Sequence, residues 1–495
     1  MLNANKLINS AFFSVSAKLL GKTLGLISTV IVARILTPED FGLIAIVSMA
    51  LYLFDILSHA AGEQYIVQKN RIAFYDIHTA WTLNIVLKVL VALVLIASAT
   101  EVATYFDKPQ LSSAIMFSAI ILPLQALKSH KLMLLKRQLR FKPLFWLSFL
   151  ERVFALPVLI TLALILKNYW AFLMTDVLVA VFGSLLSFGL LRGLPRFTLK
   201  HARQQWQFSQ WMLGKHLLGY ARSQIDTLIV AKNFSAGILG NYHMARDLAM
   251  MPAHYLLSPA IEPLLAVFKN DRTNKPELLN NVAFSLLVVF SISLPILTIF
   301  AFYSKPIVYV ILGEKWMIAA QLLPVLAILF FYWCIVQVLD AALIALDKVR
   351  FLFMFDMLSL GVVTAALLGG LYYGVSLVEL AWCRALAGLL TAFTLLIWLF
   401  IGYWRVLKPL LLLCIIVACI AFSSSLIVWL SGFTAFSTSA PSFYGLLQTG
   451  ASLAIFLVLY AGLFFVLLLK SRFYHMQRLN QLVIQYLPDT LKWKR

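Results

Sequence analysis

The chain has 495 residues, of which 62% are hydrophobic and 12% are charged, with a formal net charge of +20. A soluble domain carries about a quarter charged residues, so this composition excludes an ordinary soluble protein. Apolar runs of the ~20 residues that a membrane-spanning helix needs recur along the chain, and the ~10-residue alternating segments of a β-barrel do not appear.

Hydropathy, together with the breaks made by proline, glycine and charge, predicts an all-α polytopic membrane protein with about 14 transmembrane helices. The predicted spans are residues 8–34, 40–64, 77–100, 109–132, 143–166, 168–191, 207–232, 237–266, 278–303, 317–345, 351–373, 376–402, 409–430 and 445–469.

The distribution of basic residues predicts the orientation of these spans. With the N-terminus in the cytoplasm, most Lys and Arg residues fall in inner loops and in the two terminal segments. The outer loops hold only Arg34, Lys108, Lys167, Lys232, Lys305 and Lys315. The positive charge therefore follows membrane topology, with both termini cytoplasmic, and does not indicate a nucleic-acid partner.

The first predicted helix ends in a polar stretch, IVARILTPEDFG, at residues 31–42. Thr37 is a good helix N-cap, Pro38 suits a first helical turn, and Glu39 and Asp40 favour the positive end of the next helix. We interpret this stretch as a capped outer turn rather than as a reactive centre.

This turn is repeated 198 residues later. Residues Leu19–Gly42 and Leu217–Gly240 are identical at nine of 24 aligned positions without a gap. The offset places the seventh predicted helix on the first in the same orientation, as in parallel-repeat transporters. We predict two six-helix lobes, at residues 1–192 and 207–404, joined by an inter-lobe linker at residues 193–206. Two additional helices follow at residues 405–470, and a basic amphipathic tail at residues 471–495.

Ionisable residues inside predicted spans indicate a functional site, because they are costly in a membrane. Lys18 and Lys22 are four residues apart on the first helix, and Lys215 and Arg222 are seven apart on the seventh, so each pair shares one helix face. If the lobes face each other, these cations converge on the repeat axis, with Arg246 of the eighth helix nearby.

A cationic cluster in a low dielectric needs anions, and two sources stay open. Asp226 and Asp247 can supply the negative charge internally, or an anionic substrate can supply it, with phosphate or pyrophosphate the natural match for Lys and Arg. Asp55, Asp226 and Asp247 are also candidate coupling acids for an ion gradient.

The eighth predicted helix contains Pro252, Pro259 and Pro263, which free backbone groups and bend the helix. Such bends occur in transport pathways and in simple packing, and both interpretations remain open. The chain has no phosphate-cradling glycine loop, HExxH or GxSxG motif, so we predict neither an enzyme nor a nucleotide-driven motor. The four cysteines fall in apolar runs without metal-ligand spacing, and we expect no metal or cofactor.

Two stretches, ARILTPEDFG at Ala33–Gly42 and IVQKNR at Ile66–Arg71, resemble bacterial polysaccharide-transport flippases. These are the Wzx-type exporters of the multidrug/oligosaccharidyl-lipid/polysaccharide superfamily, and the chain is most similar to the branch serving colanic-acid-like or teichuronic-acid-like exopolysaccharides. The resemblance implies a V-shaped pair of lobes that alternate between inward-open and outward-open states in the bacterial inner membrane.

The implied substrate is an undecaprenyl-pyrophosphate-linked oligosaccharide, moved from the cytoplasmic to the periplasmic leaflet for exopolysaccharide, O-antigen or capsule synthesis. The resemblance also implies a cationic cavity, a groove for the polyprenyl tail at the last two helices, and membrane lipids and a polysaccharide polymerase or co-polymerase as partners.

Two alternatives are a cation-coupled multidrug exporter of the same superfamily and a membrane-embedded polysaccharide polymerase or ligase. The first favours an acidic cavity, and the second a large polar outer loop, whereas Ser431–Tyr444 is short and uncharged.

Overall fold

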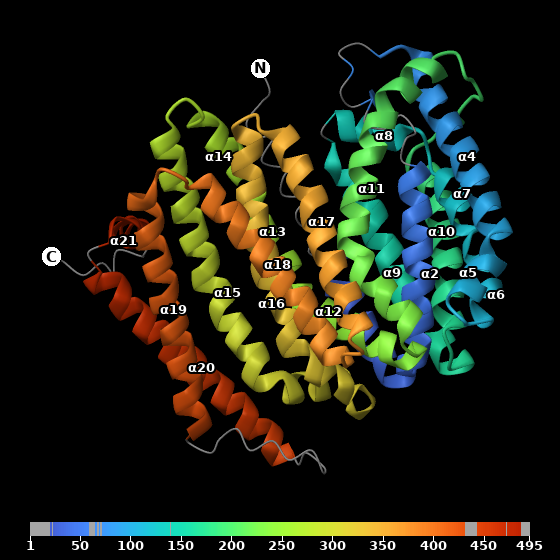
Figure 1. The fold of residues 1–495 in the computed structure, drawn as a ribbon. Coiled ribbons are helices and arrows are strands. Elements are labelled where there is room, and N and C mark those ends of the chain that lie inside the picture. Colours follow the sequence, from blue (N-terminus) through green and yellow to red (C-terminus); the bar gives the residue numbers. More distant parts are fainter. Residues whose placement is uncertain are drawn as a thin grey trace. The chain divides into compact units, whose positions relative to one another are not determined.

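The computed structural model describes residues 20–21, 23–58, 65–66, 69, 72–138, 140–430, 443–471 and 473–486, and within these ranges every regular element is a helix (Figure 1). Contacts divide the chain into two compact units. Unit 1 contains Met1–Met244 and Ile311–Trp316, and unit 2 contains Ala245–Val310 and Met317–Arg495. The lobe boundary at residues 193–206 stays a prediction.

Unit 1 begins with the helix Thr23–Ile35. The remaining helices of this unit are α2 (Pro38–Ser58), α4 (Phe74–Ala97), α5 (Ala99–Tyr105), α6 (Gln110–Ser118), α7 (Ile121–Ala126), α8 (Lys131–Arg137), α9 (Phe141–Leu166), α10 (Trp170–Leu190) and α11 (Ala202–Asn233).

Two kinds of contact hold the helices of unit 1 together. The neighbours α9 and α10 pack along their lengths, with the rings of Phe154 and Phe182 stacked 4.2 Å apart. The helices α2 and α11 are distant in sequence but also pack together, and the Tyr220 hydroxyl donates a 2.8 Å hydrogen bond to the carbonyl of Met49. A buried tyrosine hydroxyl needs such a partner, so this bond fixes α11 against α2.

The eighth predicted helix is broken, as its prolines predicted. It consists of α12 (Ala236–Pro252), the π-helical turn η1 (Ala253–Leu257), α13 (Ser258–Ile261) and α14 (Leu264–Asn270). Each break follows or contains a proline, which lacks the N–H that would continue the helical ladder.

Unit 2 also contains α15 (Lys275–Ile311), α16 (Met317–Ala345), α17 (Val349–Tyr372), α18 (Leu377–Leu399), α19 (Trp404–Leu430), α20 (Phe443–Lys470) and α21 (Tyr474–Tyr486). The turn η2 (Glu314–Trp316) precedes α16 and has contacts assigned mainly to unit 1.

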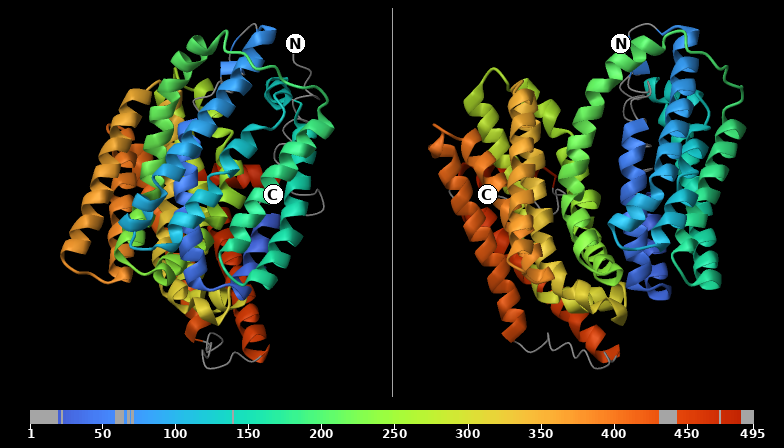
Figure 2. Two further views of the ribbon diagram at one scale, coloured as in Figure 1. Left: turned by 90° about the vertical axis from the view of Figure 1, so that its right-hand side faces the viewer. Right: turned by 45° about the vertical axis from the view of Figure 1, so that its right-hand side comes forward.

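Within unit 2, α16 packs against α18. The helix α19, orange-red in both ribbon figures, packs against α20, which is red (Figures 1 and 2). Pro295 removes the donor that Ser291 would otherwise receive in α15. The hydroxyl of Tyr460 in α20 replaces it, donating a 2.7 Å hydrogen bond to the Ser291 carbonyl. This bond joins the last long helix to the core of unit 2.

The predicted amphipathic tail is helical from Tyr474 to Tyr486. Met476 is fully buried in the hydrophobic core of unit 2. Arg478 donates a 2.5 Å hydrogen bond to the side-chain oxygen of Asn281, whose amide donates in turn to Asp271 at 2.6 Å. The tail therefore docks on its own protein through at least one turn; residues 487–495 lie outside the described part.

Nine helices of the described residues are long and apolar enough to cross a membrane, and a tenth span results if the bent pair Gln110–Ala126 and Lys131–Arg137 is counted as one. The protein is thus an all-helical polytopic membrane protein. The helices α2 and α11 coincide with predicted spans but fall outside this count of long apolar helices.

Candidate functional site

The two copies of the repeated motif pack against each other through their glycines. A Cβ atom placed on Gly42 would overlap the carbonyl oxygen of Ala236, and one placed on Gly240 would overlap the carbonyl oxygen of Pro38. Pro38 and Ala236 are separated by the same 198 residues as the two glycines. The contact is therefore reciprocal, and the backbones approach so closely that only glycine fits at either position.

The ends of the two repeat-related helices are held by two loops in the same reciprocal way. The indole N–H of Trp316 donates a 2.9 Å hydrogen bond to the carbonyl of Ala33, and the ammonium of Lys108 donates one of 2.9 Å to the carbonyl of Ala231, the repeat equivalent of Ala33. Carbonyls at a helix C-terminus lack intrahelical donors and carry negative partial charge. These two loops thus cap equivalent helix ends.

A neighbouring ion pair reinforces this arrangement. Lys232, the repeat equivalent of Arg34, lies 2.7 Å from the carboxylate of Asp107. The hydrogen bond and positive charge of Lys232 lower the pKa of Asp107, whereas burial lowers the pKa of Lys108.

Thr37 and Asp40 form the predicted cap of α2. The Thr37 hydroxyl donates to Asp40 Oδ2 at 2.6 Å, and the Asp40 amide donates back to the Thr37 hydroxyl at 3.3 Å. Asp40 Oδ1 also accepts a 3.0 Å hydrogen bond from the amide of Tyr169. The buried carboxylate is occupied by backbone and hydroxyl donors, which confirms the interpretation of PEDFG as a capped turn.

Asp55, one of the predicted coupling acids, is paired within the membrane part of unit 1. Its carboxylate lies 2.8 Å from the ammonium of Lys88, which joins α2 to α4. The Lys88 side chain is only 10% exposed, so the nearby carboxylate stabilises its charge in a low dielectric. Both residues fall within the predicted spans 40–64 and 77–100, but the sequence does not predict that they pair.

Asp226 is fully buried in α11. Its Oδ2 atom accepts a 2.9 Å hydrogen bond from the hydroxyl of Tyr242 in α12. Arg222 lies one helical turn before Asp226 and is half-buried, so the two residues share a face of α11. Lys215 lies on the same helix; its side chain is outside the described part, as are Lys18 and Lys22.

Arg246 and Asp247 belong to unit 2. Arg246 is half-buried, and Asp247 is exposed. The convergence of Arg246 with the cations of the first and seventh helices therefore stays a prediction.

Unit 2 contains a buried cation, Arg384, within the predicted span 376–402. Arg384 in α18 donates a 2.6 Å hydrogen bond to the hydroxyl of Tyr332 in α16, and its guanidinium lies 5.7 Å from the Tyr332 ring centre. Gly388, one turn further along, gives this ring its space. The contact fixes the α16–α18 packing.

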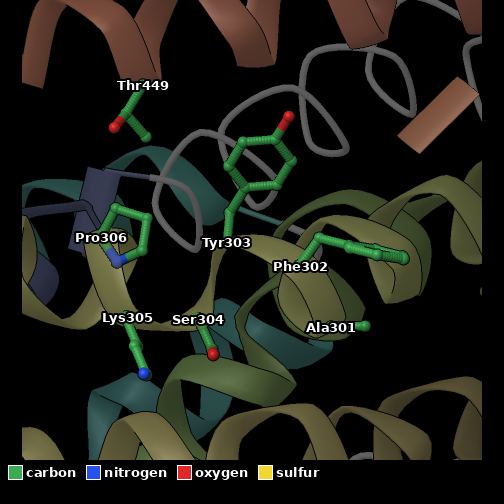
Figure 3. Close-up of a pocket in the computed structure, with 7 residues that line it drawn as sticks. All are labelled: Ala301, Phe302, Tyr303, Ser304, Lys305, Pro306 and Thr449. Carbon is green, nitrogen blue, oxygen red and sulfur yellow. The ribbon is translucent and has the colours of Figure 1, made fainter. Parts of the chain in front are cut away.

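A cavity of about 270 Å³ lies where α15 bends at Tyr303 (Figure 3). It is lined by Ala301, Phe302, Tyr303, Ser304, Lys305, Pro306 and Thr449. Tyr303 and Thr449 lie on one side of the helix, and the side chains of Ser304 and Lys305 point the other way (Figure 3). Arg246, the predicted substrate-binding residue described in this unit, does not line this cavity.

At the opposite ends of the unit 1 helices, Asp76 organises a polar cluster. Its buried carboxylate lies 3.0 Å from the Lys69 ammonium and 2.5 Å from His201 Nδ1. Arg137 donates to the carbonyls of Ile66 and Lys69 at 2.6 and 2.5 Å. These contacts connect the described residues of the IVQKNR stretch with residues that follow α10.

Among the described residues, no three His, Cys, Asp or Glu side chains are grouped so that they could hold a metal ion.

Comparison with known proteins shows the family to which the chain belongs. The sequence model of the family described as "Polysaccharide biosynthesis protein" matches residues 31–321. The chain is 24% identical to the lipopolysaccharide biosynthesis protein WzxC of Escherichia coli (strain K12), over 68% of this chain and 67% of the relative. It is 22% identical to the succinoglycan biosynthesis transport protein ExoT of Rhizobium meliloti (strain 1021), over 66% of this chain and 67% of the relative.

The fold also matches a solved structure. The lipid II flippase MurJ in an inward closed conformation superposes with a TM-score of 0.68 at 14% identity, covering 94% of this chain and all of that chain (100%). At this identity the match concerns the fold.

Proposed function

Because the chain belongs to the polysaccharide biosynthesis protein family, and is thus a multi-pass membrane transport protein of polysaccharide biosynthesis, we propose that it flips undecaprenyl-pyrophosphate-linked oligosaccharide repeat units. The direction is from the cytoplasmic to the periplasmic leaflet of the bacterial inner membrane. The similarity to WzxC, ExoT and the lipid II flippase fold supports this proposal.

The proposed architecture has 14 spans, with both termini in the cytoplasm. Two six-helix lobes, residues 1–192 and 207–404, alternate in access, and α19 and α20 follow them as a separate pair. The corresponding predicted spans, 409–430 and 445–469, contain no charged residue. They are suited to the apolar polyprenyl tail because they offer it no costly ionisable groups.

The observation that carries the proposal is the reciprocal contact of the repeat. Gly42 meets Ala236, and Gly240 meets Pro38, at helix ends that the proposed topology places outside. Parallel repeats related by an axis along the membrane normal move against each other in alternating access. A contact made symmetrically by both copies lies on that axis, so it closes the outer side until the halves separate.

The proposed substrate site lies deeper along the same two helices. Lys18, Lys22, Lys215, Arg222 and Arg246 provide the positive charge for the pyrophosphate, whose oxygens match Lys and Arg donors. Arg222 is half-buried and lies one helical turn from the fully buried Asp226, so its charge is only partly exposed to solvent.

Asp55, Asp226 and Asp247 remain the candidate coupling acids. A proton or cation on Asp55 would compete with Lys88, so coupling at this position changes the contact between α2 and α4. Moving one charge across the membrane field supplies about 2.3 kcal/mol per 100 mV, so the membrane potential alone is also sufficient to bias the cycle.

A deletion strain tests the proposal against its alternatives. We expect lipid-linked single repeat units to accumulate in the inner leaflet, as loss of a flippase requires. Unpolymerised units that reach the outer leaflet would instead indicate a polymerase or ligase, and increased drug sensitivity with normal polysaccharide would indicate a multidrug exporter. Complementation with Lys18→Ala, Lys22→Ala and Arg222→Ala at normal protein levels tests the site, and full export by all three variants would contradict it.

A further inference from the structure

The segment that follows α10 is extended and lies along the first turns of α4. Gly193 adopts a φ of +126°, a conformation that favours glycine, and turns the chain out of the helix. The amides of Arg196 and Thr198 then donate hydrogen bonds of 3.1 and 3.2 Å to His78 Nδ1 and to the Thr82 hydroxyl. The Phe197 ring, between these two amides in sequence, lies 5.1 Å from the ring of Trp81 in α4, so this contact also holds the segment along α4.

Both ends of the segment are fixed. At its start, Lys131 donates a hydrogen bond to the carbonyl of Arg192. At its end, His201 is bound to the fully buried carboxylate of Asp76. The side-chain amide of Gln205 donates a 2.8 Å hydrogen bond to the backbone carbonyl of Asp76. The segment is therefore held in place as an ordered surface rather than as a loose connection.

This ordered surface exposes large apolar side chains. Leu194 is 85% exposed and Phe197 is 73% exposed, and the neighbouring Phe74 at the start of α4 is 57% exposed. Exposing apolar area to water costs about 25 cal/mol per Å², and a fixed segment cannot fold these side chains inward. Such a patch indicates a surface that something apolar covers.

The same surface is cationic. The Arg196 guanidinium lies 5.8 Å from the Phe74 ring centre, and the Lys200 ammonium lies 4.0 Å from the Tyr75 ring centre. Arg192 is exposed at the other end of the segment. Asp76, the acid that anchors the segment, is fully buried and bound to Lys69 and His201. The exposed charge on this segment is therefore positive.

We propose that this surface binds anionic phospholipid headgroups. Arg192, Arg196 and Lys200 contact the phosphates, and Leu194, Phe197 and Phe74 enter the boundary between headgroups and acyl chains. These six residues form the linker surface.

Position and charge favour a lipid over other partners. The segment begins where α10 ends and lies on the start of α4, and both helices are membrane-spanning, so the linker surface is at the depth of the headgroups. Aromatic and basic residues together are typical of that depth, and each cation near an anionic leaflet contributes about 1 kcal/mol. The proposed topology, on which the side assignment depends, makes this the cytoplasmic leaflet.

The consequence concerns the connection between the proposed lobes. Residues 193–206 are the predicted inter-lobe linker, and the linker surface would tie its first half to the bilayer while the lobes move. Transport would then depend on the anionic lipid content of the membrane, independently of the substrate.

Amide hydrogen exchange of the purified full-length protein in lipid nanodiscs tests this proposal. One set of discs contains only phosphatidylcholine, and the other contains about 30% phosphatidylglycerol. We expect the amides of residues 193–199 to exchange at least about fivefold more slowly in the anionic discs, and 0.5 M salt to reduce the difference. Equal exchange in both discs would overturn the proposal.

A charge-matched pair of variants separates specific binding from general attraction. The triple variant Arg192→Gln, Arg196→Gln, Lys200→Gln should abolish the lipid-dependent difference. The control variant Arg350→Gln, Arg405→Gln, Lys408→Gln removes three exposed cations elsewhere and should leave the difference intact. Equal loss in both variants would overturn the assignment to the linker surface. Because the readout is exchange rather than export, the result does not depend on the proposed flippase activity.

Discussion

Substitution of Gly42 by alanine is the sharpest perturbation of the contact between the repeat copies. The new Cβ would lie 3.1 Å from the Ala236 Cα and would overlap the carbonyl oxygen of Ala236. Because both groups are backbone, no side chain can rotate away, and the two helices must separate by roughly 1 Å to restore van der Waals distance.

Overpacking of this kind costs about 1–3 kcal/mol. In a transporter that alternates between two states, the cost falls on the state in which the contact exists. We therefore expect Gly42→Ala to shift the equilibrium between closed and open outer ends by about 5- to 150-fold toward the open state.

Labelling of a buried cysteine measures this shift. Ile46 is fully buried one turn further along α2, so Ile46→Cys, in a background without the four native cysteines, reports opening of the outer end. A membrane-impermeant maleimide added from outside should react about 5- to 150-fold faster in the Gly42→Ala variant. Export should fall because the closed state is needed to complete the cycle.

Two further variants serve as controls. Gly361→Ala adds a Cβ into open space within α17 and should change neither labelling nor export. Gly240→Ala should reproduce the effect of Gly42→Ala, and the double variant should show less than the sum because both changes open one contact. Unchanged labelling and export in Gly42→Ala would refute the reasoning.

Two further predictions concern stability. Lys88→Met should destabilise the protein by about 3 kcal/mol because it removes the ammonium that lies 2.8 Å from the Asp55 carboxylate in a low dielectric. The double variant Asp55→Leu, Lys88→Met should recover most of this loss. Thermal unfolding of the detergent-solubilised variants measures both effects, and a double variant no more stable than the single variant would contradict the pairing argument. Tyr460→Phe should cost about 1–3 kcal/mol because the Ser291 carbonyl loses its donor, and an unchanged midpoint of thermal unfolding would contradict this.

Local features of the chain were predictable from the sequence. The helical class follows from apolar runs, and the breaks near Pro252, Pro259 and Pro263 follow from the missing N–H of proline, which acts within one helical turn. The Thr37 cap was predictable for the same reason, since its partner Asp40 lies three residues away. The gapless repeat indicated two related helix ends, and the structure brings those ends together.

Partners distant in sequence were not predictable. Nothing in the local sequence of Asp55 identifies Lys88 as its partner, and nothing near Ala33 identifies Trp316, because these contacts result from tertiary packing over long separations. The proposed cationic site depends on the arrangement of helices from both halves of the chain. It therefore stays a prediction that functional measurements must decide.

Transbilayer movement of substrate by the purified protein tests the central claim most directly. The protein is reconstituted into vesicles that contain an undecaprenyl-pyrophosphate-linked repeat unit, and a glycosidase added outside reports the fraction of units in the outer leaflet. We predict that the wild-type protein exposes the units initially held in the inner leaflet, and that Arg222→Ala, incorporated at the same density, slows this exposure at least tenfold. A distribution no different from that of protein-free vesicles would contradict the account.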